Sequence, residues 1–216
     1  MVAVLNQPER ITQCVTLHNV SWKTYERLLE EQGERPSPRF TYNGGDLEIM
    51  VLSYEHEEIN RFIADLFTTI ALEFNIEFRH AGSTTFKRKD LAKGFEPDSS
   101  FYTKNEPRVR SKKRIDLSVD PPPDLAIEID IAHSSLDKMD IYAKLRVPEV
   151  WRYDGKTISF HRLVKGKYRE QKTSSVLPDV TSAILTQFVN GSKKQPHSTV
   201  LRRVREWARK QTKSGT

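Results

Sequence analysis

Two carboxylates lie in unusually apolar surroundings. Asp98 follows Pro97 in a segment of aromatic and small residues, and Glu128 lies inside LAIEIDI (125–131), the most apolar run of the chain. Glu128 and Asp130 are two apart, so on a strand they project from one face. Burying them is costly without a compensating positive charge. Either a divalent cation between Asp98, Glu128 and the backbone or a buried Arg or Lys would provide it, and oxygen ligands favour Mg²⁺ or Mn²⁺ over zinc.

The composition indicates a globular protein that can bury a core of its own. The chain has 216 residues, of which 37% are hydrophobic and 30% charged. No stretch approaches the roughly 18 apolar residues of a membrane span, and the first residues do not have the pattern of a secretory signal. A single cysteine, Cys14, excludes an internal disulfide and a multi-cysteine zinc site. We therefore expect a cytoplasmic protein that does not insert into a membrane.

The positive charge is concentrated at the C-terminus. Residues 191–216 carry eight Lys and Arg and one acid, so the net charge of this segment is +7. The net charge of the whole chain is +6, which leaves a net charge of −1 for residues 1–190. The high net charge is therefore no evidence that the body binds nucleic acid. We expect one domain over residues 1–190 and a basic tail over 191–216. The tail contains an amphipathic helix near 199–211 with its apolar side formed by Val200, Leu201, Val204, Trp207 and Ala208.

Hydrophobic periodicity and turn residues predict the order of elements. Helices are expected at 21–31, at 54–74, from Ser134 or Ser135 to about 145, and at 199–211. Strands are expected at 15–20, 40–42, 47–52, 77–80, 84–87, 95–102, 125–131, 150–153, 157–163 and 168–173. This order indicates a mixed α/β sheet with helices packed on it. Regular βαβ units and a glycine-rich phosphate loop are missing from the pattern.

A Pro-Asp on one strand and an acidic residue on a neighbouring strand resemble the PD-(D/E)XK nuclease superfamily. Further stretches are similar to its large bacterial branch of restriction endonucleases, most of which are domains of unknown function. They are Arg39-Phe40, 45–50, His56, 121–128, 134–138, Tyr142 and 147–154. The resemblance covers about residues 20–190. It implies a restriction-endonuclease-like core with flanking helices and an antiparallel meander, and metal-dependent hydrolysis of phosphodiester bonds in DNA.

The sequence departs from the superfamily at one catalytic position. The superfamily has Lys two residues after the second acid, where this chain has Asp130. Two lysines of the following helix could replace it. Lys144 lies four residues after Asp140, a spacing typical of a solvated ion pair. Lys138 shares a helix face with Ile141, Tyr142 and Leu145. We therefore predict that Lys138 points inward and is the catalytic lysine; the alternative is a structural lysine with a buried stem.

The resemblance also assigns roles to the remaining residues. His56 lies three residues before Ile59 on the buried side of the long helix, where the superfamily can place a polar residue beside the metal. The alternative is a core histidine. The cation would be held by Asp98 and Glu128 with either Asp130 or the carbonyl of Ile129, and would activate a water molecule. Lys138 would orient that water or offset charge on the phosphorane.

The partners follow from charge clusters and from the symmetry of duplex DNA. The segment 104–114 carries six bases, namely Lys104, Arg108, Arg110, Lys112, Lys113 and Arg114. They could contact a nucleic-acid backbone near the metal, or they could simply be solvated. Cleavage of both strands favours a homodimer. Two alternatives remain, a non-catalytic nucleic-acid-binding or regulatory module and a metal-free interaction protein that dimerises through its Trp207 helix. Retention of Asp98, Glu128 and a lysine favours the nuclease.

Overall fold

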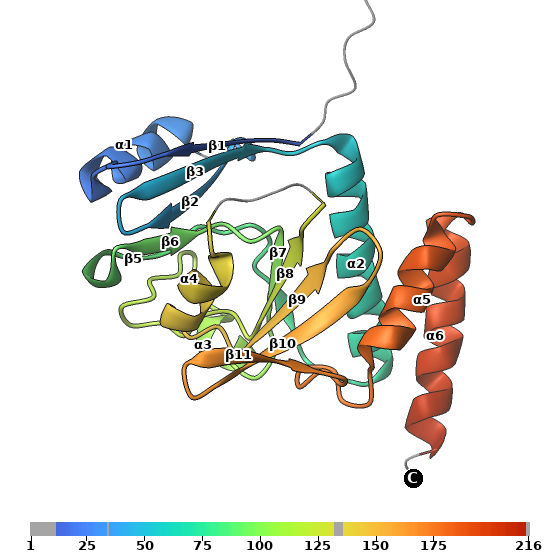
Figure 1. Cartoon of the computed structure of the whole chain (residues 1–216). Helices are drawn as coiled ribbons and strands as arrows, with labels where there is room; N and C mark the ends of the chain where they lie inside the picture. Colours follow the sequence, from blue (N-terminus) through green and yellow to red (C-terminus); the bar gives the residue numbers. More distant parts are fainter. Residues whose placement is uncertain (1–11, 34, 132–135, 215–216) are drawn as a thin grey trace, which may run out of the picture.

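The computed structural model describes residues 12–33, 35–131 and 136–214 and contains two sheets (Figure 1). The first sheet is antiparallel, in the order β1-β3-β2-β6-β5. Its strands are β1 (Gln13–Leu17), β2 (Arg39–Asn43), β3 (Asp46–Val51), β5 (Phe86–Arg88) and β6 (Lys93–Phe95). Helix α1 (Trp22–Gln32) packs on it through Tyr25, which stacks on Tyr42. The expected hairpin at 40–52 is confirmed as β2 and β3.

The second sheet is mixed, in the order β11-β10-β9-β8-β7-β4. Its strands are β4 (Arg79–His80), β7 (Ser99–Tyr102), β8 (Leu125–Ile129), β9 (Glu149–Tyr153), β10 (Ile158–Val164) and β11 (Lys167–Gln171). Strands β8 and β9 are parallel and are connected through α4 (Lys138–Lys144), whereas β9, β10 and β11 form the expected antiparallel meander. The fold is therefore a mixed α/β architecture, as predicted.

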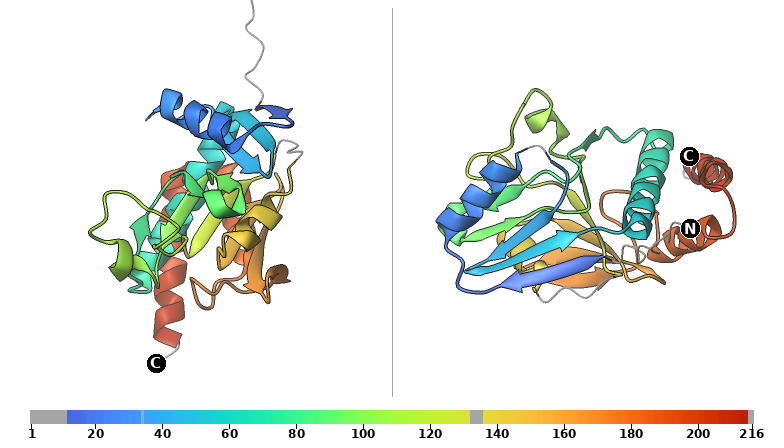
Figure 2. Two further views of the ribbon diagram at one scale, coloured as in Figure 1. Left: turned by 90° about the vertical axis from the view of Figure 1, so that its left-hand side faces the viewer. Right: turned by 90° about the horizontal axis from the view of Figure 1, so that it is seen from above.

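Helices cover both faces of the second sheet, so β8 is buried along its whole length. On one face lies α2 (Tyr54–Glu73), whose apolar stripe contacts Phe101, Ile127 and Trp151. Beside α2, α5 (Ser182–Ser192) packs on β10, and α6 (His197–Ser214) lies against α2 (Figures 1 and 2). On the other face α4 packs with β5 and β6 around Ala126 and Val150. Successive residues of β8 therefore point alternately to α2 and to α4.

Side-chain caps define where the helices begin. Ser21 accepts a hydrogen bond from the backbone N–H of Thr24, and Ser53 accepts one from that of His56. Helix α4 begins at Lys138 because Asp137 caps it through the N–H of Asp140. The start that we expected at Ser134 or Ser135 lies outside the described residues.

The prediction of one continuous strand over residues 95–102 is wrong, because the structure divides this segment between the two sheets. β6 ends at Phe95 in the first sheet and β7 begins at Ser99 in the second. Pro97 lies at the break, where a residue without an N–H cannot continue a ladder of hydrogen bonds. Asp98 consequently lies at the entrance to β7, between the two sheets.

The C-terminal segment is packed on the body. Helix α5 crosses the boundary that we expected at residue 190, and α6 lies against α2. Val200, Val204 and Ala208 of α6 are fully buried, and Arg205 and Arg209 both bond Glu73 of α2. The Trp207 ring contacts Phe74 and Phe188 of the same chain. The apolar side of α6 is therefore used within the chain, not at the dimer interface that we considered.

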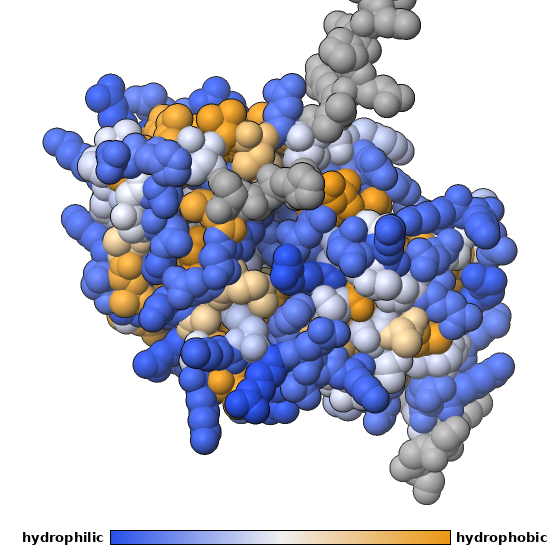
Figure 3. Space-filling view, in the orientation of Figure 1, coloured by the Kyte–Doolittle hydropathy of each residue, from blue (hydrophilic) through white to orange (hydrophobic). Residues whose placement is uncertain are grey.

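The outer surface is mostly hydrophilic. Polar and charged side chains cover most of the face in Figure 3, including much of the side where α5 and α6 lie. Figure 3 also shows apolar atoms gathered at the top of this face. Val15 and Leu17 of β1 are exposed. Across the described ranges, 12–33, 35–131 and 136–214, no helix has the length and apolar character needed to cross a bilayer.

Candidate active site

The antiparallel pairing of β7 and β8 brings the two predicted carboxylates together. Ser99 pairs with Ile127, so Asp98, just before β7, and Glu128, near the end of β8, lie at the same end of the two strands. Asp98 Oδ2 accepts a hydrogen bond from the backbone N–H of Ile129 at 2.8 Å. Asp98 is 7% exposed and Glu128 is 2% exposed. The pair is therefore buried, in the position expected from the sequence.

Helix α4 supplies the groups that hold Glu128. The ammonium Nζ of Lys138 lies 2.9 Å from Glu128 Oε2, and the hydroxyl of Tyr142 donates to Glu128 Oε1. Lys138 and Tyr142 are four residues apart and therefore share a helix face. This face turns to β8 because α4 is the crossover between β8 and β9. Each oxygen of Glu128 thus has a donor from α4.

The structure separates the two candidate lysines. Lys138 faces Glu128 and also lies 4.0 Å from Glu48 Oε1 of β3, whereas Lys144 is exposed on the outside of α4. Asp140, expected to pair with Lys144, instead contacts Lys93 of β6 at 3.1 Å. Lys138 is therefore the lysine of this pair that lies at the carboxylates, as its helix face predicts.

His56 lies beside Asp98, on the side of α2. Its Nε2 is 3.3 Å from Asp98 Oδ2, an ion-pair distance without the angles of a hydrogen bond. Within the described part of the chain, neither ring nitrogen of the buried His56 has a hydrogen-bond partner. Asn60, one turn later, donates to the backbone carbonyl of Asp98 at 3.0 Å and accepts from Ser99 Oγ at 2.8 Å. Helix α2 thus positions the start of β7 through two polar side chains.

Sequence reasoning missed two of these residues. Glu48 is 1% exposed and approaches Lys138 from the first sheet. Its alternating position in β3 does not distinguish it from a surface acid, because the contact depends on how the two sheets are packed. Asn60 could have been found, since it lies four residues after His56 on the apolar stripe of α2. A polar side chain on such a stripe indicates a buried hydrogen bond.

Burial and the neighbouring charges shift the pKa values of the site in different directions. Burial raises the pKa of Glu128 to about 7, although the Lys138 ammonium partly offsets this effect. Burial would also raise the pKa of Asp98, but His56 and Lys138 hold it below its usual range. Burial would lower the pKa of His56, and Asp98 raises it instead. The pKa of Lys138 is raised despite burial, because carboxylates surround its ammonium. At neutral pH, Lys138 is charged and Asp98 is ionised.

Asp130, the third expected metal ligand, has a different partner. Its Oδ2 lies 2.6 Å from Nε of Arg152 on β9, and its backbone N–H bonds the carbonyl of Tyr153. We expected Asp130 and Glu128 to project from the same face of the strand. The register agrees, because Glu128 pairs with Arg152, the residue that binds Asp130. One oxygen of Asp130 is thus paired with that arginine, and the prediction that Asp130 ligates the metal stays a prediction.

The remaining oxygen donors fit a magnesium ion that keeps most of its water. Among residues 12–33, 35–131 and 136–214, no three His, Cys, Asp or Glu side chains are grouped to enclose a metal. Two carboxylates suffice for Mg²⁺, which usually binds through one or two carboxylates, waters and substrate phosphates. Asp98 and Glu128 are such a pair, and their hard oxygens match this cation.

The basic segment 104–114 does not lie near the carboxylates. It follows the C-terminal end of β7 and precedes β8, so it lies at the opposite end of these strands from Asp98 and Glu128. Two of its bases are engaged locally. Arg110 bonds both oxygens of Glu106, which begins α3 (Glu106–Val109), and Lys112 lies 2.5 Å from Asp120. A contact between this segment and a nucleic-acid backbone near the metal therefore stays a prediction.

Comparisons with known proteins agree with this fold. A solved structure, described as a putative nuclease belonging to DUF820 from Anabaena variabilis ATCC 29413, matches 74% of this chain and 96% of its own, with 12% identity and a TM-score of 0.52. At this identity the match shows the restriction-endonuclease-like fold alone. No curated protein matches the chain. The model of the Uma2 family, described as "Putative restriction endonuclease", matches residues 22–193. The chain therefore belongs to the Uma2 family of restriction-endonuclease-like proteins.

Proposed function

We propose that this protein is a metal-dependent endonuclease that uses Mg²⁺ or Mn²⁺ to hydrolyse phosphodiester bonds in DNA. The observation that carries the proposal is the convergence of Asp98, Glu128 and Lys138 at one buried end of β7 and β8. Two acids on neighbouring strands and a lysine beside them are the set that the PD-(D/E)XK resemblance implies, although here the lysine is on helix α4. Membership of the Uma2 family supports the nuclease class.

Asp98 and Glu128 would hold the cation. When bound, it would polarise a phosphate oxygen and lower the pKa of a coordinated water. Glu128 is suited to this role because Tyr142 and Lys138 fix both of its oxygens. His56 and the N–H of Ile129 restrict Asp98 in the same way. Such fixed donors need little reorganisation when a substrate arrives.

Lys138 would act on the reacting phosphate as a fixed cation. Its raised pKa keeps the ammonium protonated at neutral pH, so it donates hydrogen bonds and does not serve as a base. From its place beside Glu128 it would orient the attacking water or offset the charge that develops on the phosphorane. Lys138 would thus take the role of the superfamily's lysine, which lies two positions after the second acid. In this chain that position is Asp130, which pairs with Arg152.

Supercoiled plasmid provides the test of this proposal. With manganese, wild-type protein should nick or linearise the plasmid, and Glu128→Gln and Lys138→Gln should lose at least about 100-fold in rate, in the range for loss of one transition-state donor. Lys144→Gln is the matched control, because this lysine of the same helix is exposed. Equal cleavage by wild type and Glu128→Gln would refute the assignment.

The same assay separates the nuclease from the non-catalytic module. Wild-type protein that binds DNA in manganese but leaves every plasmid intact would favour the non-catalytic reading. The observation that favours this alternative is Asp130 at the superfamily's lysine position, where it pairs with Arg152. A homodimer remains a prediction that follows from the two scissile phosphates of a duplex. Light scattering of the full chain would measure it.

A further inference from the structure

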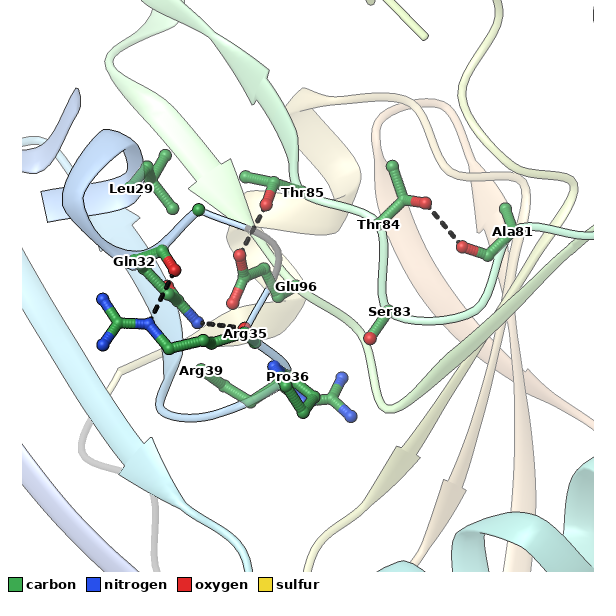
Figure 4. Close-up of a pocket in the computed structure, with 11 residues that line it drawn as sticks. Leu29, Gln32, Arg35, Pro36, Arg39, Ala81, Ser83, Thr84, Thr85 and Glu96 are labelled. Carbon is green, nitrogen blue, oxygen red and sulfur yellow. Dashed lines mark hydrogen bonds between the residues drawn. The ribbon is translucent and has the colours of Figure 1, made fainter. Parts of the chain in front are cut away.

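A pocket opens beside the carboxylate end of β7. It has a volume of about 480 Å³ and lies between the end of α1, the turn 81–85 and the start of β2 (Figure 4). Arg39 is 8% exposed and donates from Nη1 to the carbonyl of Pro97 at 2.5 Å. Its buried Nε has no hydrogen-bond partner among the described residues. Arg39 thus lines the pocket and places a guanidinium charge next to Asp98.

A second pocket continues from the first. It has a volume of about 250 Å³ and shares Ala81 and Thr84 with the pocket at Arg39. Its lining includes four basic residues and no acidic one; the bases are Arg79, Lys112, Lys113 and Arg114. Arg79 and Lys112 are paired with Glu106 and Asp120, so Lys113 and Arg114 supply the positive charge at this end. We call the two pockets together the edge groove. Its only acidic lining residue is Glu96, and burial raises the pKa of that carboxyl, which favours its uncharged form.

The edge groove follows β4, the edge strand of the second sheet. Arg79 pairs with Tyr102, and Ala81 N–H bonds the carbonyl of Ser100. The chain from residue 79 therefore runs antiparallel to β7, from its far end back towards Asp98. Five residues of strand separate Tyr102 from Pro97, which at 3.3–3.4 Å each is about 17 Å. The edge groove thus runs from the basic segment at the far end of β7 to Arg39, which bonds Pro97 next to Asp98.

The lining of the edge groove matches a chain of phosphates. The edge groove has basic residues at both ends, and the hydroxyls of Ser83, Thr84 and Thr85 lie between them. This arrangement suits a chain of anionic groups that extends over about 17 Å. A length of this order spans more than one phosphate of a single strand. The larger pocket is in the range of small-molecule sites, roughly 300–1,000 Å³. Such a site accommodates a nucleotide of one strand, whereas the two strands of a duplex would not enter it together.

We propose that the edge groove binds one single strand of the DNA substrate and leads its backbone to the carboxylates. The proposal rests on the proposed nuclease function and specifies its substrate as DNA with a single-stranded extension next to the duplex. Lys113 and Arg114 contact the phosphates farthest from Asp98, and Arg39 contacts those nearest to it. The basic segment thereby assists binding from a distance, without approaching the metal.

The test measures binding in the absence of cleavage. The protein carries Glu128→Gln throughout, and fluorescence anisotropy follows a labelled blunt duplex and the same duplex with a six-nucleotide extension. Added to this background, Lys113→Gln with Arg114→Gln should remove two phosphate contacts. Each phosphate contact of a single strand contributes about 0.7 to the slope of log K against log salt concentration. Loss of two contacts therefore lowers this slope for the extended duplex by about 1.4, which corresponds to about 25-fold weaker binding at 0.1 M salt. The blunt duplex should be much less affected.

A matched pair of bases provides the control. Lys165 and Lys167 are exposed at the turn between β10 and β11, and Lys165→Gln with Lys167→Gln changes the net charge equally. Equal losses in the two pairs, or equal losses for blunt and extended DNA, would overturn the proposal and leave only non-specific attraction. Because cleavage is never read, a failure here is distinct from a failure of the plasmid assay, and either result can occur without the other.

Discussion

Replacing Lys138 by methionine removes a cation that directly contacts Glu128. In the wild type this ammonium lies 2.9 Å from Glu128 and 4.0 Å from Glu48, and its charge also acts on Asp98. Methionine has a similar length and no charge, so the variant keeps most of the packing and leaves the buried Glu128 without this counter-ion. Removing one partner of a buried ion pair typically costs about 3–5 kcal/mol, and we expect a loss in this range at pH 8.

The loss should depend on pH, with a defined sign. The folded-state pKa of Glu128 is already raised from 4.5 to about 7, and without Lys138 it rises further. Between the unfolded pKa and the folded pKa the folded state binds more protons, so the free energy of unfolding falls as pH rises, by up to about 1.4 kcal/mol per unit. The raised pKa of Lys138 stabilises the wild type throughout this window. The cost of the substitution should therefore be largest at pH 8 and smallest near pH 5.

Urea unfolding at pH 5 and pH 8 measures both effects. The double variant Lys138→Met with Glu128→Gln should recover most of the loss, because it no longer buries the Glu128 charge. Lys144→Met, on the exposed side of α4, should stay within about 0.5 kcal/mol of wild type. A Lys138→Met protein as stable as wild type at pH 8, or one whose deficit grows towards pH 5, would refute the pairing on which the site is built.

Two further predictions concern the cation and the C-terminal helix. Manganese at 100 times its dissociation constant should stabilise the wild type by about 2.7 kcal/mol in thermal unfolding, and Asp98→Asn should abolish the shift; an unchanged shift in that variant would place the metal elsewhere. Val204→Ala, which removes two buried methyl groups of α6, should cost about 2 kcal/mol. The exposed Glu206→Ala should cost little, and equal effects of the two changes would mean that α6 is not part of the core.

Local patterns were sufficient to predict most elements and the central residues of the site. The stripe of α2, the buried run of β8 and the hairpin of β2 and β3 each appear as a periodicity within one segment. Glu128 was recognised because a carboxylate inside an apolar strand needs a partner. Lys138 was distinguished from Lys144 by its helix face alone. These inferences succeeded because each depends on the geometry of a single element, which its own residues largely determine.

Contacts between elements were decided only by the tertiary structure. Arg152 neutralises Asp130 because β9 pairs in parallel with β8, and Glu48 approaches Lys138 because the first sheet packs over α4. The basic segment lies far from Asp98 because antiparallel β7 and β8 place their connection at the other end. Helix α6 is packed on α2, whereas its amphipathic pattern alone did not show which surface covers it. Each result depends on strand order and packing between distant segments, whereas periodicity within a segment shows which face is buried but not what covers it.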